Sequence, residues 1–392
     1  MTATRAVVFV SATAISLIPA LLTAYSGGPP VRRTGAPGDR TCLDATCHVG
    51  ARFNASADLT LETGVGSHSY TPGGAAQRWT IRIGDTNARA YGLQLSVRSG
   101  SDLAQRGAGS LTAVEPLTSV ICNDEQFKGA AGCPGVQPVE FLHHVEPKRT
   151  GTFAVEWTPP SSASAGDAVV YVIANASVSG QRNARIHQRA FLIRPAGGPS
   201  VVNAASLAEG ISPGAWITIF GRGFAGAGEL QVRVNGLPAT VGYSSDTQIN
   251  ALSPDHDELA GPVPVEVRRG QTLLATVVAM QQRAAPALFT LTHENAVLAV
   301  ATHADGTPAT GPGARPIRPG VLLHLYATGL DASSATARFG DGPPISTVPT
   351  LASPGLHRLE LTVPALPEGL HPLAISSGGV SSPSGVQLAI SR

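Results

Sequence analysis

The sequence predicts an all-β protein made of several sandwich domains, and three observations lead to this prediction. The chain holds 44 glycines and 31 prolines, and they fall between short apolar runs rather than in one low-complexity tract. This spacing is typical of many β-turns. Within the runs, apolar and polar residues alternate, as they do in strands with one buried face. A length of 392 residues exceeds one ordinary core, so two or three domains are expected.

The N-terminus has the pattern of a secretory signal peptide, here residues 1–26. Arg5 supplies the positive charge, the apolar run covers residues 6–23, and small residues follow it. The alternative is an uncleaved membrane anchor, but the run is short for a bilayer span and holds several Ser and Thr residues. No second segment is apolar enough to cross a membrane. We therefore expect an extracytoplasmic protein, secreted or at the cell surface, with no membrane span in the mature chain. The formal net charge of +1 offers no basic surface for a nucleic acid.

A first sandwich is expected over residues 41–196, after a linker at 27–40 in which prolines and glycines leave no room for a regular element. Alternating apolar positions predict strands at 79–83, 91–97 and 153–157. The continuous apolar run 168–174 predicts a central strand. Two facing sheets are needed to bury these apolar faces, which indicates a β-sandwich.

The rest of the chain holds two similar units, expected at 197–290 and 291–392, after a hinge at 195–199. Each unit opens with a Pro-Gly turn and an alternating strand, at Pro213-Gly214 and at Pro319-Gly320. In the first unit Asn235-Gly236 predicts a hairpin turn. A period of about 100 residues fits an immunoglobulin-sized sandwich rather than a solenoid repeat.

The motif with the clearest chemistry is Cys42…Cys47-His48. A c-type haem is attached through two cysteines, and the histidine after the second one ligates the iron. The usual motif has two residues between the cysteines, whereas this one has four. Two alternatives stay open: a Cys42–Cys47 disulfide, which is natural in an oxidising compartment, and a site for zinc or another metal, which would need a fourth ligand.

Cys122 and Cys133 flank a glycine-rich, charged loop, and we expect them to form a disulfide. Closing this loop stabilises the fold by about 2–3 kcal/mol on the chain-entropy argument. The alternative is pairing with Cys42 or Cys47, which would exclude a haem.

The C-terminal half resembles the IPT/TIG-like module of large secreted bacterial proteins. The resemblance rests on residues 202–206, 213–221, 234–239, 248–250, 286–289 and 326–329. It implies immunoglobulin-like sandwiches in a surface or secreted context and carries no known catalytic residue. The second unit departs from the pattern, since only residues 358–361 stand where a Gln-Ile/Val-Asn stretch is expected.

The N-terminal part resembles the reeler-like (choice-of-anchor V type) domain of bacterial surface proteins. The matching residues are 34–39, Cys42…Cys47-His48, 70–73, His144 and 157–160. The resemblance implies a β-sandwich and extracellular placement, and it leaves open whether haem is bound.

A haem iron held by His48 would need a sixth ligand, normally Met or His. Met280 is the only methionine beyond the initiator and lies in another expected domain, so a histidine is the better candidate. Strand alternation places His143 and His144 on opposite faces, and amphipathicity favours His143 pointing inward. The family pattern, an aromatic residue followed three positions later by histidine, favours His144, which ranks first. His68 is a third candidate.

Two functions remain open at this stage. In one, Cys42, Cys47, His48 and a distal histidine hold one covalent haem c, and the protein transfers electrons outside the cytoplasm to a redox partner. In the other there is no cofactor, both cysteine pairs form disulfides, and the protein is an adhesive or structural surface component with a protein or glycan partner. Hydrolase motifs such as Gly-x-Ser-x-Gly and His-Glu-x-x-His are absent from the sequence, which argues against an enzyme.

Overall fold

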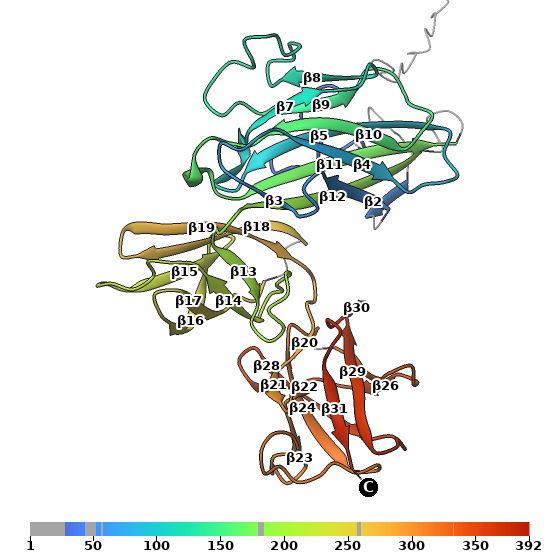
Figure 1. The fold of residues 1–392 in the computed structure, drawn as a ribbon, viewed down its shortest axis with the longest axis vertical. Helices are drawn as coiled ribbons and strands as arrows, with labels where there is room; N and C mark the ends of the chain where they lie inside the picture. The colour runs from blue at the N-terminus through green and yellow to red at the C-terminus, as the bar shows by residue number, and fades with distance from the viewer. Residues whose placement is uncertain are drawn as a thin grey trace, which may run out of the picture.

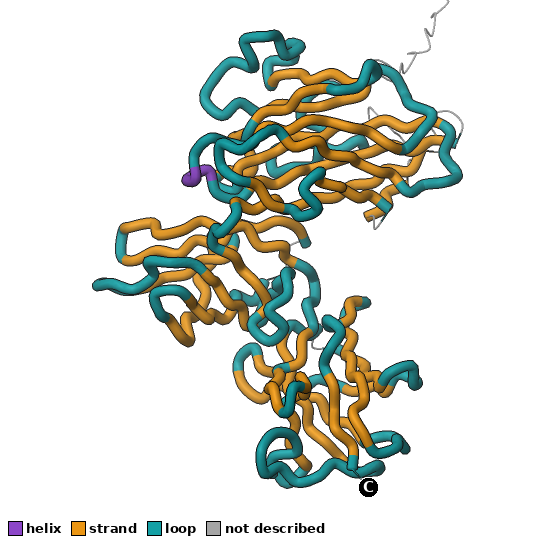
Figure 2. Tube along the Cα trace, viewed as in Figure 1, coloured by secondary structure: helices purple, strands orange, loops and turns teal. Residues whose placement is uncertain are grey.

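The computed structural model describes residues 28–43, 52–55, 58–178, 184–256, 260–331 and 333–391. In these ranges the chain forms strands joined by turns, with one short 3-10 helix, η1 (Ala163–Ala165) (Figure 2). Three sandwiches follow one another along the long axis of the molecule (Figure 1). The all-β prediction is therefore confirmed. The expected signal peptide lies outside the described residues, and no helix within them is long and apolar enough to cross a lipid bilayer.

The front sandwich consists of an eight-stranded sheet packed on a four-stranded sheet. The larger sheet has the order β1 (Arg52–Ala55), β12 (Ala184–Pro195), β11 (Ala168–Ser177), β5 (Ala90–Ser99), β9 (Glu140–His144), β8 (Thr118–Cys122), with β3 (Ser69–Tyr70) beside β12 and β6 (Asp102–Gly107) beside β5. The smaller sheet has the order β2 (Leu59–Thr63), β4 (Gln77–Ile83), β10 (Thr152–Thr158), β7 (Ser110–Ala113). The apolar run at 168–174 forms a central strand, as predicted.

Two stacked tryptophans fill the core between these sheets. The rings of Trp79 and Trp157 have centroids 4.7 Å apart, and both side chains are fully buried. Their N–H groups are satisfied, since Trp79 donates to Gln77 and Trp157 donates to the carbonyl of Ala108. Large aromatic side chains with paired polar atoms contribute strongly to a sandwich core. The predicted alternation over 79–83 and 153–157 is confirmed by the burial of these strands.

The middle sandwich is a single sheet that folds over on itself. Its order is β13 (Ser200–Asn203), β14 (Trp216–Phe220), β17 (Gln248–Leu252), β16 (Leu237–Ser244), β15 (Leu230–Val234), β18 (Gly261–Arg269), β19 (Thr272–Gln281). Strand β16 pairs with β15 through its first half and with β17 through its second half, so it belongs to both layers. The predicted hairpin is present: Asn235 and Gly236 join β15 to β16 with φ of 50° and 79°.

The third sandwich has two separate sheets. One has the order β20 (Ala287–Leu288), β24 (Leu322–Thr328), β28 (Leu356–Thr362), β27 (Thr350–Ser353), with β23 (Ala301–His303) beside β24. The other has the order β21 (Thr290–His293), β22 (Ala296–Ala299), β31 (Gln387–Ile390), β29 (Gly369–Ser377), β25 (Ala335–Phe339), β26 (Ile345–Thr347), with β30 (Val380–Ser381) beside β29. Apolar side chains from both sheets form one core.

Two of the expected domain boundaries differ from the structure. Strand β20 pairs with β24, so the third sandwich begins before residue 291, and the boundary after 290 is wrong by a few residues. Residues 28–40 lack regular structure, as expected, but they are not a linker. They pack on the front sandwich, for the reasons given below.

Candidate functional site

The outer face of the eight-stranded sheet is buried, although it points away from the sandwich core. In β5, Leu93, Leu95 and Val97 face the core. Gln94, Ser96 and Arg98 face outward, yet these side chains are fully buried as well. Strand β19 of the middle sandwich covers one end of this face through Val278 and Met280. Residues 28–43, which we call the strap, cover the rest.

Polar contacts fasten the strap to β5. The side chain of Gln94 accepts a hydrogen bond from the Arg33 N–H at 2.7 Å and donates to the Pro30 carbonyl at 2.9 Å. Farther along, Arg98 Nη2 donates to Asp39 Oδ2 at 2.6 Å, and both of these side chains are fully buried. The strap is thus held by a buried ion pair and by its own backbone, so it is an integral layer of the front sandwich.

Glycines let the strap lie this close to the sheet. Gly28 has φ of 98°, and a Cβ there would lie 2.3 Å from the carbonyl oxygen of His144. Gly35 has φ of 72°, and a Cβ there would lie 2.2 Å from the amide of Gln188. A left-handed backbone conformation and a close approach both require glycine. The 34–39 stretch of the reeler resemblance therefore has a structural explanation in strap docking.

Cys42 ends the strap on this same outer face. Its side chain is buried against Ile173 of β11 and Ile186 of β12. Cys47 and His48 lie outside the described residues. The structure therefore fixes where the Cys-His motif begins, which is over the β11–β12 pair.

His144 lies on the outer face as well, with its ring over Gly92. A Cβ on Gly92 would lie 2.5 Å from the His144 ring, so the missing side chain makes room for the imidazole. The Nδ1 atom lies 3.1 Å from both the N–H and the carbonyl oxygen of Leu93. This main-chain contact fixes the ring and leaves Nε2 as the nitrogen that could bind a ligand. Burial lowers the pKa of His144, and the Leu93 hydrogen bond opposes that effect.

Cys42 and His144 lie near one another across the sheet. Ile186, Asn175 and Gly92 are directly paired across β12, β11 and β5, so they form one row. Two strand spacings separate the ends of this row, or about 10 Å. Cys42 packs at one end of the row and the His144 ring covers the other.

His143 also faces outward, opposite Gln94, but the strap encloses it. Its ring is 4% exposed and lies next to Gly28 and 6.2 Å from the Phe127 ring. Burial, with a further contribution from His144, lowers the pKa of His143 to about 4, against an opposing effect of the Pro29 backbone. Neither ring nitrogen makes a hydrogen bond of ordinary geometry. The inward orientation expected for His143 is wrong, because Leu142 faces the main core instead.

His68 lies in another part of the sandwich. Its carbonyl pairs with the N–H of Arg194, and its Nε2 lies 3.2 Å from the Leu61 carbonyl oxygen. Arg194 is eight residues along β12 from Ile186, where Cys42 packs, which corresponds to about 26 Å of strand. The structure therefore does not bring His68 close to Cys42.

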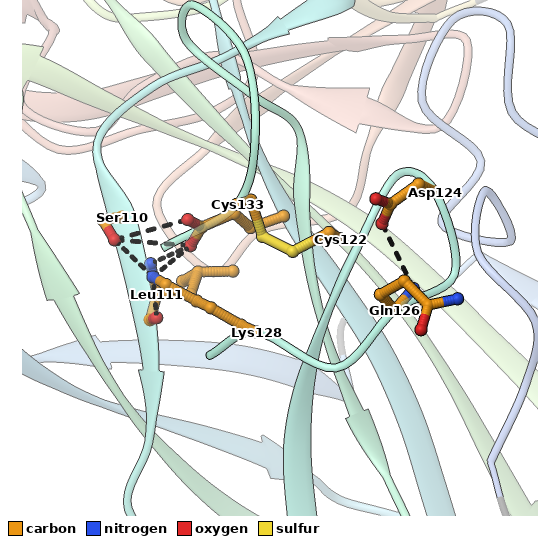
Figure 3. Close-up of a disulfide and its surroundings, with 8 residues drawn as sticks. Ser110, Leu111, Cys122, Asp124, Gln126, Lys128 and Cys133 are labelled. Atoms are coloured by element: carbon orange, nitrogen blue, oxygen red, sulfur yellow. Dashed lines mark hydrogen bonds and ion pairs between the residues drawn. A yellow bond between two sulfur atoms is a disulfide. The ribbon is translucent and has the colours of Figure 1, made fainter. Parts of the chain in front are cut away.

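Cys122 and Cys133 form the expected disulfide (Figure 3). The alternative pairing of either residue with Cys42 or Cys47 does not occur. Within the loop that the bridge closes, Lys128 Nζ contacts the Leu111 carbonyl of β7 at 2.8 Å and Glu140 Oε2 of β9 at 2.9 Å. The loop is thus tied to both sheets of the front sandwich.

Among the described residues, no group of three or more His, Cys, Asp or Glu side chains could hold a metal ion. A metal-bound histidine typically has its other ring nitrogen bonded to a backbone carbonyl or carboxylate. The Leu93 carbonyl lies in reach of Nδ1 of His144 for such a bond, and the Leu93 N–H lies at the same distance from that atom. His144 is anchored by Leu93 and lies on the same sheet face as Cys42.

Sequence reasoning assigned no role to Asp39, Arg98 or Gly92. Arg98 could have been noticed as the one charged residue in an otherwise uncharged strand, and Asp39 as the acidic end of the 34–39 stretch. No sequence signal places the His144 ring over Gly92, because the contact joins residues far apart in the chain.

The comparisons with known proteins agree with the fold of the middle sandwich. The model of the family described as "IPT/TIG domain" matches residues 202–282, which confirms the resemblance for the first of the two units. No curated protein matches the chain.

Several solved structures are similar to parts of the chain. The human F-spondin reeler domain is 14% identical with a TM-score of 0.28, and the match covers 38% of this chain and 95% of that one. SGBP-B of Bacteroides ovatus, solved with a mixed-linkage heptasaccharide, is 13% identical with a TM-score of 0.31. That match covers 73% of this chain and 64% of that one, so this chain spans less than two thirds of its length. A putative membrane-anchored protein of Corynebacterium diphtheriae is 12% identical with a TM-score of 0.16, over 84% and 91% of the two chains.

Proposed function

We propose that the protein is an extracytoplasmic electron carrier whose front sandwich holds one covalent c-type haem. The observation that carries the proposal is the His144 ring, which is anchored at Nδ1 by Leu93 and lies on the same sheet face as Cys42. Cys42 and Cys47 would form the thioether bonds, His48 would be the proximal ligand and His144 the distal one. When bound, the haem supplies reversible one-electron transfer.

The chain's own residues support this role in three ways. Leu93 contacts Nδ1 of His144 through its N–H and its carbonyl oxygen, and this restrains rotation of the ring. Burial keeps His144 neutral by lowering its pKa, and a neutral imidazole is the form that binds a metal. The strap, fastened by Asp39 and Arg98, leads the chain directly to Cys42 and so positions the start of the motif.

The test is to express the chain in a host with haem-attachment machinery and to record absorbance after acid-acetone extraction. We expect a red protein whose colour stays on the chain. His144→Ala should change the iron from low spin to high spin, because one axial ligand is lost. His143→Ala is the matched control on the same strand and should leave the spectrum unchanged.

A colourless product with no free thiols would overturn the proposal. It would favour the second candidate, a cofactor-free surface protein with a Cys42–Cys47 disulfide. The observation that favours this candidate is the packing of Cys42 in a small apolar cluster with Ile173 and Ile186. Circular dichroism of each variant separates loss of haem from loss of fold.

A further inference from the structure

An open cleft of about 680 Å³ lies where the middle and third sandwiches meet. One wall comes from β14, β16 and β17 of the middle sandwich, through Trp216, Tyr243 and Asn250. The other wall includes Phe289 and Tyr326 of the third sandwich. The volume is within the range of pockets that hold small molecules or a few units of a polymer.

The middle-sandwich wall is the outer face of the sheet. Tyr243, Asn250 and Thr218 are paired across β16, β17 and β14, and Trp216 is two residues from Thr218 on the same face. A β-bulge interrupts β16 between Val241 and Tyr243. The Trp216 and Tyr243 rings therefore stand on strands rather than on loops, which favours a preformed site.

Trp216 is held firmly in the cleft. A Cβ on Gly242 would lie 2.7 Å from the indole, so the ring packs directly on the backbone of the bulge. Its Nε1 donates to the Pro354 carbonyl at 2.9 Å, and its backbone N–H donates to Thr328 Oγ1 at 3.0 Å. Both acceptors belong to the third sandwich, so the two walls are fixed relative to one another.

The polar groups of the cleft are neutral. Asn250 Oδ1 accepts hydrogen bonds from Thr218 at 3.1 Å and from Gln248 at 2.8 Å, which leaves the NH₂ of the same amide for a ligand. Hydroxyls come from Tyr243, Tyr326 and Ser353. Among the described residues that line the cleft, none carries a charge.

We infer that this cleft binds a neutral carbohydrate chain. Sugar rings present C–H faces that pack on aromatic rings, and hydroxyls that pair with amides and hydroxyls. A charged ligand would lose hydration with no opposite charge to compensate for it. A purely apolar ligand would cover the Asn250 amide without a hydrogen bond. Tyr243, 52% exposed, is the aromatic side chain most available to a ligand.

This inference is independent of the haem, because the cleft is formed without any residue of the front sandwich. The test uses the full chain and titrates it with hexasaccharides of β-linked glucose, mannose or xylose in a calorimeter. Intrinsic fluorescence gives a second readout, since Trp79 and Trp157 are fully buried and Trp216 is the remaining tryptophan.

At least one of the three neutral hexasaccharides should bind and change the Trp216 fluorescence. Tyr243→Ala should weaken that binding about tenfold, the effect of losing one aromatic stacking contact. Phe127→Ala is the matched control, because it removes an aromatic ring that is 67% exposed on the front sandwich. The inference is overturned if none of the three binds at millimolar concentration, or if Tyr243→Ala and Phe127→Ala bind equally well.

Discussion

The buried ion pair between Asp39 and Arg98 fixes the position of the strap on the sheet. Arg98 Nη2 donates to Asp39, Nε donates to Ser96 Oγ at 2.9 Å, and Nη1 donates to the Ala104 carbonyl at 2.8 Å. The guanidinium is thus fully surrounded by acceptors although it is out of water. Such a network specifies one docked position for the strap, since any shift would leave a buried charge without its partner.

Replacing Asp39 by alanine should therefore be costly. Arg98 would remain buried without its counter-ion, and the free energy of unfolding should fall by about 3–5 kcal/mol. Glu62→Ala is the matched control, because the Glu62–Arg82 pair has the same chemistry with both side chains about half exposed. Urea denaturation measures both variants, and equal midpoints for the two would contradict the role given to Asp39.

At the scale of elements, the sequence predicts the strands and their core-facing side chains well. It predicts poorly whether the opposite face of a strand is buried. The alternation in 91–97 identifies the core face of β5, and the run 168–174 identifies a central strand. The burial of Gln94, Ser96 and Arg98 could not be predicted, because the strap that covers them looks like a linker in the sequence. His144 ranks first only through the family pattern. Alternation places the side chains of His143 and His144 on opposite faces of the sheet, whereas the structure has both on the outer face.

The disulfide loop gives a prediction at this scale. Cys122→Ala with Cys133→Ala removes the closure of an 11-residue separation, and the free energy of unfolding should fall by about 2–3 kcal/mol. The Lys128–Glu140 ion pair should persist, because its partners lie on strand β9 and on a loop that also bonds to β7. Thermal denaturation under non-reducing conditions checks this. Adding Lys128→Met to the double variant measures how much the Lys128 contacts with Glu140 and Leu111 contribute to stability once the disulfide is absent. An unchanged denaturation midpoint in the double variant would contradict the prediction.

At the scale of the whole molecule, the junction between the front and middle sandwiches depends on a few buried contacts. The local sequence does not predict these contacts, because the residues that make them lie far apart in the chain. Asp167 of the front sandwich accepts a hydrogen bond from the Val278 N–H of the middle one at 2.7 Å. Arg194 lies 3.5 Å from the same carboxyl oxygen, and it also pairs with Glu209 across the junction. The expected hinge at 195–199 is thus flanked by fixed contacts.

This junction should respond to pH through Asp167. Burial raises the pKa of Asp167 to about 6, against the opposing effects of Arg194 and Val278. The native state therefore holds its proton more tightly than the unfolded chain does. The resulting stabilisation is complete below about pH 4 and is lost as pH rises to about 6, by on the order of 2–3 kcal/mol. The contribution of His143 to the pH dependence of stability has the opposite sign over an overlapping range, because its lowered pKa makes protonation destabilising.

Asp167→Asn keeps an acceptor for Val278 and removes the titration of the carboxyl group. Subtracting its unfolding free energy from that of the unmodified chain between pH 4 and 7 cancels the contribution of His143. The difference should fall as pH rises, and parallel profiles would show that the Asp167 carboxyl does not titrate with the junction.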